Sequence, residues 1–244
     1  MAALDQPWLF VLRAEEFSMA DPAKAELLQS LGRVVQGLSA LFWGVPLGFI
    51  AYVQTARTDW LDSFGPFSVA PALILSGVLF HALVQLRHFQ RQERIWQQSL
   101  DRAEVFAVLN LGLVPFLFWW HRMPGVPLYA ACVTLLTITG LLFLIHLNCV
   151  LRRLTAMLPD ETLRSETRTF TGLNTLMLLT VLGLLCLYFA LLRIPDLPCV
   201  IQGFLAVIGS EGLWLAVFMI LMPLAITMAL IWKIKETIFS SVFR

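Results

Sequence analysis

Two histidines occupy matching positions near the ends of long apolar segments. His81 lies six residues before Arg87, and His146 lies six residues before Arg152. If both segments cross a membrane in the same direction, the two imidazoles lie at one depth, about two helical turns inside the surface. Facing histidines in a helical bundle can be the axial ligands of a b-type haem. The alternative is that each imidazole bonds a polar side chain of the next helix.

Three arginines recur where long apolar segments begin. Each follows a serine by three residues, in the pairs Ser30 and Arg33, Ser99 and Arg102, and Ser165 and Arg168. Arginines at the edge of a membrane extend toward phosphate headgroups and anchor the helix that carries them. A ring of arginines around a vestibule would instead attract an anionic solute. The set predicts interfacial anchors, with anion binding as the alternative.

The same arginines mark an internal repeat. Thirteen residues after Arg33 and Arg102 stand Pro46 and Pro115, whereas the third copy has Val181 there. Repeats of this kind indicate a fold built from repeated supersecondary units. We expect an N-terminal segment, residues 1–28, followed by three parallel two-helix hairpins, residues 29–97, 98–164 and 165–244.

Composition indicates a membrane protein. Apolar residues make up 59% of the 244 residues and charged residues only 14%, and the mean hydropathy is +0.79. Soluble domains contain about 25% charged residues. About twenty apolar residues span the roughly 30 Å of bilayer hydrocarbon. The sequence predicts an all-α integral membrane protein with six spans, near residues 34–55, 68–87, 104–121, 127–151, 170–192 and 212–233, and a helix from about residue 22 that continues into the first.

The connections between spans differ in charge. Of the 17 Lys and Arg residues, only three, Arg57, Arg122 and Arg193, follow spans one, three and five. The others lie in the two termini and in the connections after spans two and four, which we expect to form amphipathic helices. Because cytoplasmic loops carry the excess of Lys and Arg, both termini are expected in the cytoplasm.

Polar and small residues within the spans are expected to join helices. An interhelical hydrogen bond in a membrane contributes about 0.6 kcal/mol, glycines let helices approach closely, and prolines bend them. The candidates for hydrogen bonds are Asn110, Thr134, Thr137, Thr139, Asn148, Asn174, Thr175, Thr180 and Thr227. Those for close approach are Gly44, Gly48, Gly112, Gly140 and Gly183, and those for bends are Pro46, Pro115 and Pro223.

The sequence contains no catalytic motif and no nucleic-acid-binding pattern. There is no Gly-x-Ser-x-Gly, His-Glu-x-x-His or phosphate-binding loop, and every Asp and Glu lies in a loop, a tail or a span end. No basic stripe is present. Cys132, Cys149, Cys186 and Cys199 lack the spacing of metal ligands, so no metal site is expected.

These observations predict a non-catalytic, multi-pass membrane protein. We expect a subunit or scaffold of a membrane complex, in contact with lipid and with other membrane proteins or copies of itself. The first alternative is a transporter or channel for a small solute or anion, with Arg33, Arg102 and Arg168 as binding residues. The second is an electron carrier that holds haem b between His81 and His146.

Overall fold

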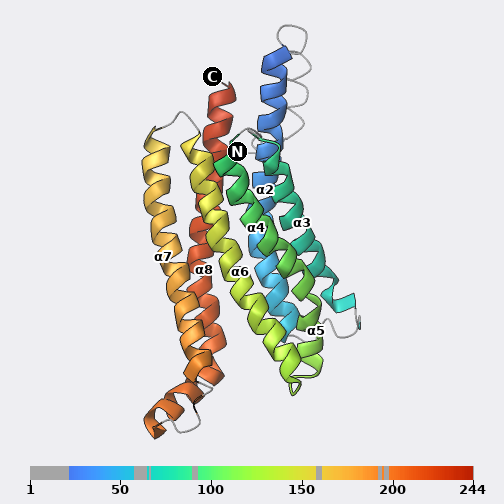
Figure 1. Ribbon diagram of the computed structural model, residues 1–244, viewed down its shortest axis with the longest axis vertical. Helices are drawn as coiled ribbons and strands as arrows, with labels where there is room; N and C mark the ends of the chain where they lie inside the picture. The colour runs from blue at the N-terminus through green and yellow to red at the C-terminus, as the bar shows by residue number, and fades with distance from the viewer. Residues whose placement is uncertain are drawn as a thin grey trace.

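The computed structural model describes residues 22–57, 65, 67–89, 93–157, 161–191, 194 and 198–243. In these residues all regular structure is helical (Figure 1). The α-helices are α2 (Pro22–Arg57), α3 (Ala70–Arg87), α4 (Arg94–Leu113), α5 (Pro115–Arg122), α6 (Pro127–Ala156), α7 (Glu161–Leu191) and α8 (Cys199–Phe243).

Six helical stretches are long and apolar enough to cross a membrane. They are Gln29–Ala56, Phe67–Arg87, Arg94–Arg122, Pro127–Ala156, Arg164–Leu191 and Val217–Ser240. Each overlaps one predicted span, so the described residues contain the predicted number of sufficiently long, apolar helices at the predicted places. The predicted continuation of a helix from about residue 22 into the first span is also confirmed, because α2 is one unbroken helix.

The polar connections extend the spanning helices. α4 begins at Arg94, ahead of the predicted span start at residue 104, and α6 continues to Ala156 before α7 begins at Glu161. The described residues of these connections are thus helical, as predicted, and they form the ends of the long helices. Continuing a helix beyond the apolar layer keeps its backbone groups paired, whereas each new terminus leaves four N–H or C=O groups without helical partners.

Proline interrupts the third span and leaves two others continuous. α2 and α8 run through Pro46 and Pro223. α4 ends just before Pro115, where α5 begins, and the Leu117 N–H donates to the Val114 carbonyl at 3.0 Å. Proline has no N–H for the α-helical bond, so a tighter turn forms at this point.

The helices pack around the bundle in chain order. α2 packs against α3, α3 against α4, α4 against α6, α6 against α7 and α7 against α8, and α8 returns to α2. The rings of Phe42 in α2 and Trp232 in α8 lie 5.8 Å apart across this closing contact. α5 packs against α2 and α6. The start of α2 and the end of α8 lie at the same end of the bundle (Figure 1).

Two glycines bring α2 and α3 close together. A Cβ on Gly37 would lie 3.0 Å from the Ala82 carbonyl oxygen, and one on Gly44 would lie 3.0 Å from Leu79 Cδ2. Close approach at Gly44 is thus confirmed, whereas Gly48 has ordinary spacing, 3.7 Å from Leu79. The close approach expected at three further glycines is wrong, since an added Cβ would meet nothing within 4 Å at Gly112, Gly140 or Gly183.

Candidate functional site

A cavity of about 450 Å³ lies inside the helical bundle. Its walls come chiefly from the second half of α2, the first half of α6, α5, and the facing parts of α7 and α8. It therefore occupies the half of the bundle remote from the start of α2 and the end of α8 (Figure 1). Sites for small molecules typically measure about 300–1,000 Å³. The cavity is large enough to hold such a ligand.

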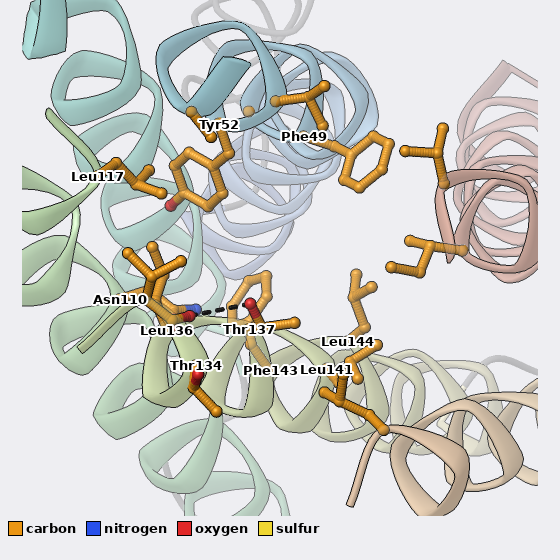
Figure 2. Close-up of a pocket in the computed structure, with 18 of the residues that line it drawn as sticks. Phe49, Tyr52, Asn110, Leu117, Thr134, Leu136, Thr137, Leu141, Phe143 and Leu144 are labelled. Carbon is orange, nitrogen blue, oxygen red and sulfur yellow. Dashed lines mark hydrogen bonds between the residues drawn. The ribbon is translucent and has the colours of Figure 1, made fainter. Parts of the chain in front are cut away.

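The cavity wall is apolar and uncharged. Its hydroxyl and amide side chains are Tyr52, Asn110, Thr134 and Thr137, and every other lining side chain in the described part of the chain is uncharged as well. Figure 2 shows Phe49 and Tyr52 entering the cavity from α2, with Asn110 and Thr137 on the opposite wall. This surface fits an apolar molecule with few polar groups. No positively charged side chain among the described lining residues could compensate an anion for the loss of its hydration shell.

The hydroxyl groups of the cavity already donate their protons. Ser76 Oγ donates its one proton to the Ala72 carbonyl at 2.7 Å. The Tyr52 hydroxyl lies 2.7 Å from Ser76 Oγ, so in this contact Tyr52 is the donor and Ser76 the acceptor. Thr134 and Thr137 each donate, at 2.9 Å, to the carbonyl four residues earlier in α6. These oxygens are left with lone pairs and can only accept a further hydrogen bond.

Asn110 supplies a donor at the cavity wall. Its Oδ1 accepts a hydrogen bond of 2.6 Å from Thr139 Oγ1, and this contact joins α4 to α6. The same hydroxyl also lies 2.9 Å from the Leu135 carbonyl oxygen and 3.1 Å from the Leu136 carbonyl oxygen of its own helix. The Asn110 side-chain nitrogen has no acceptor among the described residues. Only 6% of Asn110 is exposed, and the residue lines the cavity. Asn110 thus offers N–H groups to a molecule in the cavity.

A second polar cluster joins three helices. Asn174 Nδ2 in α7 donates to Asn148 Oδ1 in α6 at 3.0 Å and to Thr227 Oγ1 in α8 at 2.9 Å. Asn148 Nδ2 lies 3.3 Å from the same Thr227 oxygen, and Thr227 donates to the Pro223 carbonyl at 2.9 Å. All three polar side chains are fully buried. This cluster fixes α6, α7 and α8 against one another.

Eight of the nine polar residues expected to join helices fall into two groups. The residues that bond between helices are Asn110, Thr139, Asn148, Asn174 and Thr227. The hydroxyls of Thr134, Thr137 and Thr180 instead donate to carbonyls within their own helices. A threonine hydroxyl reaches the carbonyl one turn earlier without help from another helix, whereas an asparagine amide extends further. The prediction is confirmed for the three asparagines, Thr139 and Thr227, and is wrong for these three threonines. It is also wrong for Thr175, whose hydroxyl bonds no other helix among the described residues.

The structure does not bring His81 and His146 together. They lie on α3 and α6, and α4 packs against both helices and lies between them (Figure 1). His81 is exposed, with Nε2 3.0 Å from Gln85 Nε2. His146 Nδ1 lies 2.9 Å from the Leu142 carbonyl oxygen. Facing imidazoles would require α3 and α6 to be neighbours, but α4 intervenes, and the described residues provide no facing pair of imidazoles for haem b.

The three repeated arginines lie outside the cavity. Arg33, Arg102 and Arg168 are all exposed, on α2, α4 and α7. The acids next to two of them pair with other cations, since Asp101 bonds Arg87 and Glu166 bonds Lys233. This placement favours interfacial anchoring over a shared anion site.

Arg87 has a role that the sequence pattern does not mark. Its Nη2 lies 3.0 Å from Asp101 Oδ1 and its Nη1 lies 3.0 Å from Glu104 Oε2, so one guanidinium of α3 binds two carboxylates of α4. The signal available in the sequence is the three-residue spacing of Asp101 and Glu104, which places both acids on one helix face.

Comparisons with other proteins add no assignment. No family model, curated protein or solved structure matches this chain. The functional argument therefore rests on the cavity, the polar clusters and the placement of the charges.

Replacing Asn174 with leucine is expected to loosen the three-helix cluster. The change removes two interhelical hydrogen bonds and leaves Asn148 Oδ1 buried without a donor. At about 0.6 kcal/mol for each bond, and at most about 1.7, the loss should be roughly 1–3 kcal/mol. Thermal unfolding of the purified protein in detergent, followed by tryptophan fluorescence, measures it.

Thr180→Val on the same helix is the matched control. The Thr180 hydroxyl is exposed and bonds only its own helix, so this variant should unfold at the temperature of the unmodified protein. Equal effects of the two substitutions would contradict a stabilising role for the cluster.

Proposed function

We propose that this chain is a non-catalytic, multi-pass membrane protein that acts as a subunit or scaffold of a membrane complex. The observation that carries the proposal is the fully buried cluster of Asn148, Asn174 and Thr227, whose polar groups bond to each other across three helices. Deeply buried polar side chains in transport or proton pathways face a cavity or an ionisable partner. Here they hold helices together, as expected of a structural component.

The charged side chains support the same proposal. Arg87 joins α3 to α4 through Asp101 and Glu104, and Lys233 in α8 pairs with Glu166 in α7. These ion pairs lie at the end of the bundle where α2 starts and α8 ends (Figure 1). Charges placed there fix neighbouring helices and leave the cavity uncharged.

The chain consists of three hairpin repeats, α2 with α3, α4 and α5 with α6, and α7 with α8. Support comes from the direct packing of the two long helices in each pair. The exposed positions of Arg33, Arg102 and Arg168 near the start of each first helix agree with this division. The termini face the cytoplasm, because fourteen of the 17 Lys and Arg residues lie on that side.

The second candidate function is transport of a small uncharged solute. The cavity inside the bundle is the observation that favours it. The uncharged wall disfavours anions, and Arg33, Arg102 and Arg168 are exposed and do not line the cavity.

Cysteine labelling tests the orientation. In a variant whose four native cysteines are replaced by alanine, Gly125→Cys lies in the exposed turn after α5 and Gln98→Cys lies on the exposed side of α4 near its start. A membrane-impermeant maleimide added to intact cells should label Gly125→Cys and should label Gln98→Cys only after the membrane is opened. The opposite pattern would reverse the topology.

Photo-crosslinking in native membranes tests the scaffold proposal. A photoreactive phenylalanine analogue is placed singly at exposed apolar positions of five helices: Val78, Val108, Leu135, Leu176 and Met222. If the chain is a complex subunit, positions on the helices at the interface should give a protein adduct of constant mass. Positions on the other helices should give lipid adducts and serve as internal controls. Lipid adducts alone from all five positions would contradict the proposal.

A further inference from the structure

The cavity wall contains an amide nitrogen that has no acceptor among the described residues. Asn110 is 94% buried, and Thr139 uses its Oδ1, while no described residue accepts from its side-chain nitrogen. An N–H group within a membrane protein is costly to leave unpaired, because lipid offers no acceptor in the hydrocarbon layer. A molecule in the cavity that presents an oxygen to Asn110 would complete this site.

The remaining wall restricts the chemistry of that molecule. Phe49, Leu141 and Leu144 are typical of the wall, which requires a hydrocarbon body. The hydroxyls of Tyr52 and Thr137 have donated their protons and can accept one from a ligand hydroxyl. No charged side chain of the described residues lines the cavity, so nothing would bind a phosphate headgroup or a carboxylate.

We propose that this cavity binds an uncharged amphiphile from the bilayer, a hydrocarbon body with a hydroxyl or carbonyl oxygen that accepts a hydrogen bond from Asn110. The volume of about 450 Å³ fits a small-molecule ligand. An alcohol suits the site best, because its oxygen accepts from Asn110 while its proton goes to one of the cavity hydroxyls. The site goes beyond a scaffold role, since a complex subunit needs no internal ligand.

Photolabelling of the purified full-length protein in liposomes tests the proposal. Three probes carry the same diazirine in a hydrocarbon chain: a long-chain fatty alcohol, the corresponding alkane, and a phosphatidylcholine. Labelled positions are mapped by peptide mass spectrometry. The alcohol should label residues of α2 and α6 at the cavity, about two- to ten-fold more than the alkane does, the range that corresponds to one net hydrogen bond.

Two glycine variants locate the labelling. Gly140 lines the cavity and an added Cβ would meet nothing within 4 Å, so Gly140→Phe fills the space without backbone contact and should abolish cavity labelling. Gly112→Phe is the matched control, because Gly112 is equally unobstructed but lies outside the cavity wall, and it should leave labelling unchanged.

A competition experiment avoids dependence on any variant. Excess unlabelled fatty alcohol should displace the alcohol probe from the unmodified protein, and excess phosphatidylcholine should not. Equal cavity labelling by the alcohol and the phosphatidylcholine probe would overturn the proposal, because it would show ordinary lipid chains in the cavity. Absence of alcohol labelling at the cavity would overturn it as well, whether or not a partner protein is found by crosslinking.

Discussion

Inside a bilayer, polar groups have no water to bond, and apolar side chains gain little by leaving lipid for protein. Helices of such a protein must therefore be held by close packing and by hydrogen bonds between them. Here the bonds among Asn148, Asn174 and Thr227 join α6, α7 and α8. At the other side of the bundle, Gly37 and Gly44 let α2 approach α3. The closed arrangement of helices depends on these contacts.

The elements of the fold could be predicted from the sequence because they depend on local properties. Apolar length indicates the six helices that could span a membrane. The prolines are less predictable, because α4 ends before Pro115, whereas α2 and α8 continue through Pro46 and Pro223. The faces of the helices could not be predicted in this way. His81 and His146 stand at matching sequence positions, yet the order of packing places α4 between their helices. Gly112, like Gly44, is a glycine within an apolar segment, but a Cβ added to Gly112 would meet no atom of another helix within 4 Å.

The candidate site could be predicted only in part, because it too depends on which faces of the helices meet. Asn110 is recognisable as a polar residue in an apolar span, and its bond to Thr139 is the expected interhelical contact. That its amide nitrogen has no acceptor among the described residues follows only from the three-dimensional arrangement around it. Tyr52 reaches the same cavity from a distant part of the chain, and its partner Ser76 carries no motif. Sites formed by several helices leave little trace in any single one.

The closure of the bundle links the fold to its function. α8 contacts α2, and both helices contribute to the cavity wall, so the cavity depends on the closed ring of helices. The most direct test is thiol crosslinking in native membranes of Phe42→Cys combined with Trp232→Cys, whose native rings lie 5.8 Å apart. A short bifunctional maleimide should join this pair within one chain, and should not join Trp232→Cys to Trp43→Cys, because Trp43 faces outward with 58% of its surface exposed. Equal crosslinking of the two pairs, or none of the first, would contradict the closed bundle.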